Sequence, residues 1–263
     1  MSAILRKLRL RVVIRRYEVI LFGCVVLLSG AVIPAKWEPP FRPYPLPLVE
    51  PLPQRPWIAL TFDDGPHAGR TEQLLAVLKK ARVPATFFVV GKMADRYPQL
   101  LRRISDDGHQ LANHTYSHPN LSGLSDDNVI GELEQTRDVI QRLTGQKSTL
   151  FRPPGGDFSR RTVRVTSQAG YQMVLWSILS RDLNGTPPGT MRRRILQNAA
   201  DGGIVLMHSG MPNTIAMLPD LIAQLKDRGF HFVTVSTLLG LPDMHRPDPA
   251  ETPLLQTAAG KQY

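Results

Sequence analysis

The sequence predicts an α/β fold, a distorted (β/α)7-type barrel, over residues 57–241. Two observations predict it. Short apolar runs rich in β-branched and aromatic residues alternate with stretches in which apolar residues recur at helical spacing, which indicates a parallel sheet covered by helices. Residues capable of chemistry also follow the ends of several runs, as they do at the C-terminal edge of a barrel, where active sites lie.

Seven apolar runs are predicted as strands, which indicates a barrel with fewer than eight repeats. They cover residues 58–62, 85–90, 110–113, 149–152, 173–176, 203–208 and 231–235. Helices are predicted between most of these strands. The examples with the clearest apolar stripes are residues 72–80, 126–143 and 215–228.

The first strand ends in the paired carboxylates Asp63 and Asp64, followed by the turn residues Gly65 and Pro66. Two adjacent carboxylates repel each other unless a cation lies between them or their roles differ. This pattern indicates a metal site with a neighbouring base. Taken alone, the stretch is explained equally well by a plain strand-to-turn junction, in which Asp-Asp-Gly is common.

The third strand is followed by His114 and His118, four residues apart. This spacing allows two imidazoles to share one ion, although such pairs are more often surface coincidences. One of the paired aspartates is available as the third ligand. Two histidines and a carboxylate suit a catalytic zinc, and the same set also binds Fe(II) and other divalent ions.

Two further strand ends carry a basic side chain. Arg152 precedes the rigid loop Pro153-Pro154-Gly155-Gly156, whose backbone amides can approach a ligand closely, and His208 ends the sixth strand. Singly, Arg152 is explained as a surface ion pair and His208 as an ordinary strand-end residue. Their shared position at strand ends favours a common site.

These motifs together resemble the polysaccharide deacetylases of carbohydrate esterase family 4, which remove acetyl groups from N-acetylated sugars in chitin-like oligomers and bacterial cell-wall glycans. The resemblance covers residues 57–241, and the motifs follow the family's order. They are Thr61-Phe62-Asp63-Asp64-Gly65-Pro66, His114 with His118, Arg152-Pro153-Pro154, and Leu206-Met207-His208. The resemblance implies a metal-dependent hydrolase that acts on linear amides.

The resemblance also implies a role for each of the main polar residues. The metal ligands are Asp64, His114 and His118, and zinc is expected, with cobalt, nickel or iron as alternatives. Asp63 is the general base and Arg152 orients it. His208 is the general acid that protonates the departing amine.

The remaining assignments concern the oxyanion and the substrate. The resemblance implies that the Gly155 backbone N–H binds the oxyanion, and Asp182 is assigned to tune His208. The residues expected to line the substrate groove are Pro153, Pro154, Trp176, Leu183 and Leu206. Phe158 is a further candidate for the groove, but for both Trp176 and Phe158 the favoured interpretation is that the aromatic side chain fills the core.

Two motifs depart from the family's pattern. Gly155 stands where the family usually has an aromatic residue, so a substrate contact is lost while the backbone donor is kept. The motif that usually reads Asp-x-x-Asp-Trp is Leu179-Ser180-Arg181-Asp182-Leu183 here. Leu183 supplies an apolar wall of smaller area than an indole. These changes bear on the tuning of the acid and on the acetyl pocket.

The N-terminal region predicts where the domain works. A basic flank, residues 1–18, precedes an apolar segment, residues 19–33, which is interpreted as a signal anchor or transmembrane helix. Prolines recur in residues 34–56 and predict an extended stalk, for which a disordered linker is the alternative. The catalytic domain is assigned to residues 57–241 and a loosely ordered tail to residues 242–263. The expected location is a single-pass cell-membrane protein with an extracellular domain, secreted if the segment is cleaved.

Composition supports this division. The first 56 residues hold nine of the 32 Lys/Arg and three of the 22 Asp/Glu, so most of the formal charge of +10 lies outside the domain. A nucleic-acid partner is therefore not expected. Cys24, the single cysteine, lies in the apolar segment, so the domain depends on its core and contains no internal disulfide. The sequence leaves the oligomeric state open.

The function predicted from the sequence is removal of N-acetyl groups from an extracellular polysaccharide. The membrane segment favours peptidoglycan, at N-acetylglucosamine or N-acetylmuramic acid. A chitooligosaccharide or an exopolysaccharide is the first alternative. A non-carbohydrate amide deacylase and a weakly active glycan-binding protein are the others.

Overall fold

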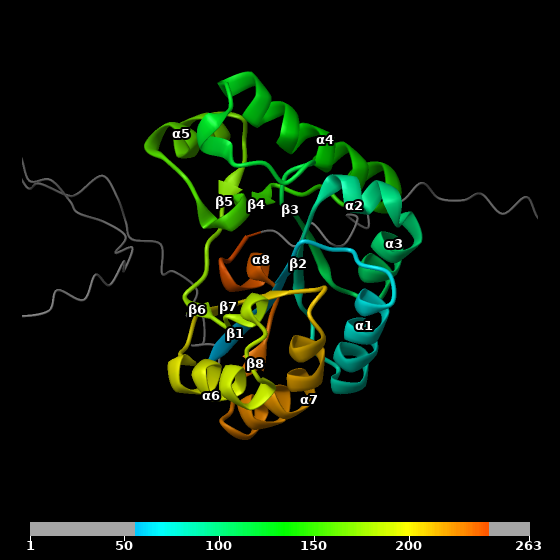
Figure 1. Cartoon of the computed structure of the whole chain (residues 1–263), viewed down its shortest axis with the longest axis vertical. Helices are drawn as coiled ribbons and strands as arrows, with labels where there is room; N and C mark the ends of the chain where they lie inside the picture. The colour runs from blue at the N-terminus through cyan, green and yellow to red at the C-terminus, as the bar shows by residue number, and fades with distance from the viewer. Residues whose placement is uncertain (1–55, 242–263) are drawn as a thin grey trace, which may run out of the picture. The chain divides into compact units, whose positions relative to one another are not determined.

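The computed structural model describes residues 56–241, a curved parallel sheet with helices packed around it (Figure 1). The strands are β1 (Trp57–Asp63), β2 (Thr86–Val89), β3 (Gln110–Asn113), β4 (Leu150–Phe151), β5 (Gln172–Met173), β6 (Ile178–Leu179), β7 (Gly203–His208) and β8 (His231–Phe232). The α-helices are α1 (Arg70–Ala81), α2 (Gly91–Arg96), α3 (Pro98–Asp106), α4 (Asp126–Thr144), α5 (Arg160–Gln168), α6 (Pro188–Asn198), α7 (Pro212–Asp227) and α8 (Val235–Leu238). Three 3-10 helices are η1 (Leu121–Gly123), η2 (Pro154–Gly156) and η3 (Asp182–Asn184).

The strands form one sheet in the order β5-β4-β3-β2-β1-β7-β6, and β8 pairs with β1 outside this order. Every strand pair is parallel. Within the described residues, β5 and β6 form the two ends of the order, so the sheet curls without closing. This confirms the predicted parallel α/β barrel in a distorted, open form.

The predicted strand at residues 173–176 is wrong in extent. β5 ends at Met173, and a separate strand that the sequence did not predict, β6, follows. The carbonyls of Val174 and Leu175 accept hydrogen bonds from the Arg152 guanidinium, at 3.2 and 3.1 Å. These carbonyls therefore bind a side chain and do not extend the strand pairing. The run predicted at residues 231–235 is also shorter, because the Thr234 side chain accepts from the Thr237 N–H and caps α8.

Alternate residues along each strand face opposite sides of the sheet. In β1, Ile58, Leu60 and Phe62 belong to the large cluster that the outer helices cover, whereas Ala59 belongs to a second cluster inside the barrel. Thr61 and Asp63 follow Ala59 at two-residue spacing and therefore face the inside as well. The same alternation places the polar residues of the other strand ends on the inner side.

The helix boundaries follow local signals. The Ser125 side chain accepts from the Asn128 N–H at the start of α4, and Gly145 ends that helix with a φ of 73°. Ser159 and Thr162 form a reciprocal capping box at the start of α5. The helices predicted at residues 72–80, 126–143 and 215–228 correspond to α1, α4 and α7.

The predictions about the chain ends concern residues that the structure leaves undescribed. The apolar segment at residues 19–33, most of the Pro-rich stretch at 34–56 and the tail at 242–263 lie outside the described part. Among residues 56–241, no helix combines the length and the apolar character that a membrane span requires.

Candidate active site

The C-terminal edge of the sheet brings the predicted site residues together. Asp63 and His208 are directly opposite in the register of β1 and β7. Asn113 is opposite Phe151 in β3 and β4, so His114 and Arg152 follow neighbouring strands at the same level. The parallel arrangement therefore gathers residues from four strands at one edge.

Three side chains at this edge form a group that could hold a metal ion. Asp64 Oδ1 lies 3.4 Å from His114 Nε2 and 3.3 Å from His118 Nε2, and the potential ligand atoms all lie within 4.8 Å of one another. One carboxylate oxygen and two imidazole nitrogens are a suitable donor set for zinc and related divalent ions. The residues present therefore fit the predicted metal.

The two histidines are held differently. His114 is buried, and its Nδ1 lies 2.8 Å from the Arg152 carbonyl oxygen, which orients the ring so that Nε2 faces Asp64. The His118 side chain is 41 % exposed, and the residue lies in the irregular loop between β3 and η1. Its hydrogen bond to Asp64 raises the pKa of His118. Burial alone raises the pKa of Asp64, but the hydrogen bonds from both histidines outweigh burial and hold this pKa well below its usual range.

Asp63 is buried and paired with Arg152. Its Oδ1 accepts from Arg152 Nη1 at 2.7 Å, and its Oδ2 faces His114 Nε2 at 3.8 Å. Arg152 is fully buried and donates also to Thr61, while its guanidinium lies 4.0 Å from the centre of the Phe88 ring. A buried arginine with these partners orients the carboxylate and compensates its charge.

His208 and Asp182 form a second buried pair. His208 Nδ1 lies 2.7 Å from Asp182 Oδ1, and the His208 backbone N–H donates to Asp182 Oδ2 at 2.7 Å. Burial alone lowers the pKa of His208, but the hydrogen bond and the charge of Asp182 outweigh it, and the pKa is raised. The structure thus brings Asp182, which was assigned to tune His208, against this predicted acid.

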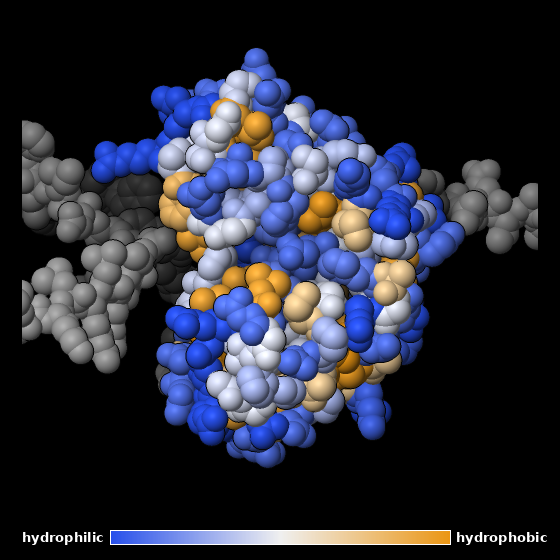
Figure 2. Space-filling view, viewed as in Figure 1, coloured by the Kyte–Doolittle hydropathy of each residue, from blue (hydrophilic) through white to orange (hydrophobic). Residues whose placement is uncertain are grey.

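The predicted groove residues differ in exposure. Leu183 is 56 % exposed and Trp176 is partly buried, whereas Pro153, Pro154 and Leu206 are buried. Phe158 is 45 % exposed, so its interpretation as a core residue is wrong. Figure 2 shows a mainly hydrophilic surface on the face that it presents, with apolar side chains in small groups.

Gly155 is exposed and has a φ of 65°, in the left-handed region that favours glycine. A Cβ built on it would meet nothing within 4 Å. Gly156 also has a positive φ, but there a Cβ would lie 2.4 Å from the Trp176 ring. The glycine loop therefore packs directly against this indole.

Three residues that support the site were not among the predictions. Thr61 donates to the Val205 carbonyl and accepts from Arg152, and the Ser209 hydroxyl donates to the Asp63 carbonyl. Both stand inside or beside the recognised motifs, which could have revealed them. Thr214 lies near the start of α7, and its hydroxyl donates to Asp182 Oδ2 at 2.7 Å. No sequence signal marks Thr214 as a site residue.

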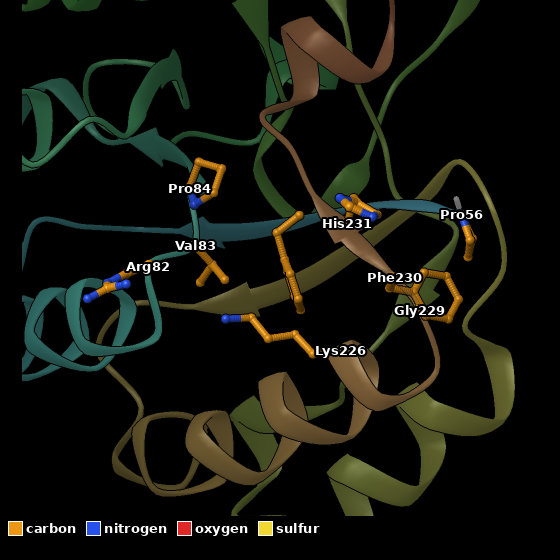
Figure 3. Close-up of a pocket in the computed structure, with 9 residues that line it drawn as sticks. Pro56, Arg82, Val83, Pro84, Lys226, Gly229, Phe230 and His231 are labelled. Carbon is orange, nitrogen blue, oxygen red and sulfur yellow. The ribbon is translucent and has the colours of Figure 1, made fainter. Parts of the chain in front are cut away.

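A cavity of about 590 Å³ lies away from these residues (Figure 3). Pro56, Val83 with Pro84, and Phe230 with His231 line it, and these residues precede or begin β1, β2 and β8. The cavity therefore lies at the N-terminal end of the sheet. The chemistry-bearing groups are at the opposite, C-terminal edge, and we place the candidate site there.

Comparison with known proteins gives the same family as the motifs. The family profile described as polysaccharide deacetylase matches residues 52–174. The chain is 36 % identical over 194 residues to the peptidoglycan-N-acetylmuramic acid deacetylase PdaA of Bacillus subtilis, covering 72 % of this chain and 74 % of that protein.

Solved structures agree. The Bc1960 peptidoglycan N-acetylglucosamine deacetylase is similar with a TM-score of 0.70 and 33 % identity, covering 72 % of this chain and 90 % of that one. The chain is also similar to BA3943 of Bacillus anthracis, which is described as a carbohydrate esterase family 4 pseudoenzyme. The TM-score is 0.65 and the identity 30 %, and the match covers 72 % of this chain and 66 % of that one. This chain belongs to the polysaccharide deacetylases of carbohydrate esterase family 4, and it is a hydrolase of the deacetylase type.

Proposed function

We propose that this protein is a metal-dependent hydrolase that removes N-acetyl groups from the amino sugars of peptidoglycan. The observation that carries the proposal is the arrangement at the C-terminal edge of the sheet. There a two-histidine, one-aspartate group lies beside a buried carboxylate on one strand and a buried histidine on the next. Metal-assisted hydrolysis of an amide uses three functions together: a metal ion as the electrophilic centre, a base and an acid.

Asp64, His114 and His118 would hold the divalent ion, with zinc as the expected metal. The chemistry that such a site supplies when loaded is polarisation of a carbonyl and a lower pKa for water. The Arg152 carbonyl accepts from His114 Nδ1 and so leaves Nε2 free as the ligand atom. Two imidazole nitrogens and a single carboxylate favour zinc over calcium or magnesium, because the latter two ions prefer ligand sets made of oxygen atoms.

Asp63 acts as the general base. Arg152 occupies one carboxylate oxygen, so the other is the atom that takes the proton from the attacking water. Pairing with a fully buried guanidinium also fixes the rotamer of Asp63. The base therefore needs little reorganisation when the substrate binds.

His208 acts as the general acid. Its Nδ1 is engaged with Asp182, so Nε2 is the atom that donates a proton to the leaving amine. The raised pKa of His208 favours the protonated form that this step requires. Because Asp63 and His208 are register partners on adjacent strands, about 4.8 Å apart in backbone spacing, the amide can lie between base and acid.

The Gly155 backbone N–H is the proposed donor to the oxyanion. Its exposure and the open space around it allow a substrate carbonyl to approach. Losing one such donor typically costs on the order of a hundredfold in rate. The exposed Leu183 is the proposed apolar contact for the acetyl methyl group.

The substrate is proposed from the relatives. Proteins named for N-acetylglucosamine and for N-acetylmuramic acid in peptidoglycan both match this chain, so we propose the peptidoglycan backbone without choosing between its two sugars. The test is acetate release from purified peptidoglycan by the full-length protein, with and without a chelator. Chitooligosaccharides and an N-acetylated peptide serve as comparison substrates. Release from the peptide alone would contradict the proposal.

The similarity to a pseudoenzyme supports one alternative, a glycan-binding protein with little turnover. Residues Gly155, Leu179 and Leu183 depart from the usual motifs and favour this alternative. The buried pairs Asp63–Arg152 and His208–Asp182 argue against it. Burying charged groups costs desolvation free energy, and a role in turnover would explain why both pairs are kept. Peptidoglycan binding with bound zinc but without acetate release would favour the binding protein.

We also propose that residues 19–33 anchor the chain in the membrane and hold the domain on the outer side. The basic flank and the uncharged apolar run support this. Peptidoglycan is extracellular, which agrees with the location. Membrane fractionation should recover the chain in the membrane fraction. Protease added to intact cells should digest the domain, because the domain is accessible from outside. Recovery of the full-length chain in the soluble cytosolic fraction would contradict the anchor.

A further inference from the structure

The loop that carries both histidines, residues 114–118, has an unfavourable backbone conformation. Thr115 and His118 have φ angles of 65° and 60°, in the left-handed region that residues with a Cβ seldom adopt. The loop lies between β3 and η1 and belongs to neither. Contacts from outside the loop must therefore stabilise this conformation.

Glu132, on α4, supplies such contacts. Its Oε2 accepts from the Tyr116 N–H at 2.8 Å and from the Ser117 N–H at 2.7 Å, and its Oε1 accepts from the Ser117 hydroxyl at 2.7 Å. Hydrogen bonds to an ionised acceptor are stronger than those between neutral groups. Two consecutive backbone amides directed at one oxygen form a small anion-binding nest, which the carboxylate of Glu132 fills.

The start of α2 holds the opposite side of the same loop. The Gly91 N–H donates to the Thr115 carbonyl at 3.0 Å, and the Lys92 N–H donates to the Tyr116 carbonyl at 2.9 Å. Gly91 also allows close approach, because a Cβ built on it would lie 2.5 Å from the Tyr116 ring. The loop is thus clamped between α2 and Glu132.

His118 depends on this clamp more than His114 does. His114 is 3 % exposed and is oriented by the Arg152 carbonyl. The His118 side chain is 41 % exposed, and the contacts given for it, with Asp64 and with the His114 ring, are contacts with the other two candidate metal ligands. Its position is therefore set by the backbone of the loop.

We propose that Glu132 is a positioning residue of the metal site, which sets the affinity for the divalent ion by holding the Tyr116 and Ser117 amides and thereby the backbone at His118. This inference rests on the metal-dependent function proposed above. Glu132 acts through the loop and has no contact with the three ligands among its hydrogen bonds. Supporting groups behind metal ligands typically change metal affinity by about 10–100-fold.

The test measures zinc affinity of the full-length protein by competition with a chromophoric chelator. Glu132→Ala should weaken zinc binding at least about tenfold. Glu132→Gln keeps the shape and one carbonyl acceptor for the two amides, so its affinity should fall between those of the alanine variant and wild type. At saturating zinc, Glu132→Ala should regain most of its kcat, because base and acid are untouched.

Glu134→Ala is the matched control. Glu134 lies on the same helix, is about half exposed, and pairs only loosely with Arg137 at 3.5 Å. Its replacement should leave zinc affinity unchanged. An equal loss in the Glu132 and Glu134 variants would overturn the inference, because it would show a general effect of α4.

Unchanged zinc affinity in Glu132→Ala would also overturn the inference. If that variant does not fold, Glu132→Gln decides alone: a severalfold loss supports the inference, and wild-type affinity overturns it. Wild-type protein that takes up no zinc is a different failure, since it would remove the metal-dependent function itself. The wild-type titration therefore separates the two.

Discussion

At the scale of single residues, Arg152 contacts both Asp63, the proposed base, and His114, a candidate metal ligand. Its guanidinium donates to Asp63 and Thr61, and its carbonyl oxygen orients His114. The side chain is fully buried, so its charge is compensated by these partners and by the Phe88 ring. A substitution of this side chain would remove the guanidinium from Asp63 and Thr61 but keep the backbone carbonyl that orients His114.

The paired aspartates should be separable by substitution. Asp63→Asn should lower kcat by on the order of a hundredfold or more and keep the metal, since a general base contributes about that much. His114→Ala should lose the metal itself, because it removes one of three ligands. Acetate release and metal content by elemental analysis measure the two effects. Equal loss of metal in both variants would show that the roles of Asp63 and the ligands are misassigned.

Asp182 should set the alkaline limit of activity. The acid form of His208 is present below its raised pKa and is lost as the pH rises through that value. Asp182→Asn removes the charge that raises this pKa, so the alkaline limb of the kcat/KM profile should move to lower pH. The exposed Asp220, paired with Arg192, provides the control Asp220→Asn, which should leave the profile in place. An unmoved limb in Asp182→Asn would refute this role.

At the scale of elements, short strands and 3-10 turns position the site. β4 and β5 contain two residues each, and η2, with its two glycines, begins after Arg152 and Pro153. Longer regular strands would use the Val174 and Leu175 carbonyls for sheet pairing, and these carbonyls are the ones that hold Arg152. The irregularity on this side of the barrel is therefore tied to the buried arginine.

The two glycines of η2 should respond differently to substitution. Gly155→Ala should cost on the order of 1–2 kcal/mol of unfolding free energy, because alanine disfavours the left-handed conformation. Gly156→Ala should cost more, since its Cβ would also overlap the Trp176 ring at 2.4 Å. Urea unfolding of both variants measures the difference. Equal costs would mean that the indole moves aside freely.

At the scale of the whole molecule, the three candidate metal ligands come from segments that follow two different strands. Asp64 follows β1, whereas His114 and His118 follow β3, and β2 lies between these strands in the sheet. An ion bound to all three would hold the C-terminal ends of these strands together. Binding to the folded state alone must then stabilise the domain.

Removing the metal should therefore lower the Tm of the domain. At a zinc concentration a hundredfold above Kd, linkage gives about 2.7 kcal/mol, which corresponds to on the order of 5–10 °C for a domain of this size. Thermal unfolding with zinc and with chelator measures the shift. His114→Ala should show little response to zinc. A full shift in that variant would place the stabilising ion elsewhere.

Much of the fold was predictable because its signals are local. The parallel α/β class, the helices α1, α4 and α7, and the strand ends that carry Asp63, His114 and His208 follow from spacing and turn residues. The strand at residues 173–176 was not predictable in extent, because the side chain of Arg152, which follows β4, donates to the carbonyls of Val174 and Leu175. β6 was missed because two residues carry no periodic pattern.

The sequence by itself determined which edge of the sheet bears the reactive side chains, since a parallel strand fixes the direction in which its ends point. The family resemblance implied that Arg152 orients Asp63 and that Asp182 tunes His208, and only the tertiary structure showed the contacts that form these pairs. Asp63 and Arg152 are 89 residues apart, and Asp182 meets His208 and Thr214 across separate elements. Glu132, on a half-exposed helix, reaches the histidine loop in the same way. Such pairings depend on how strands and helices pack in space. No local pattern in the chain encodes which residues that are far apart in the sequence come into contact.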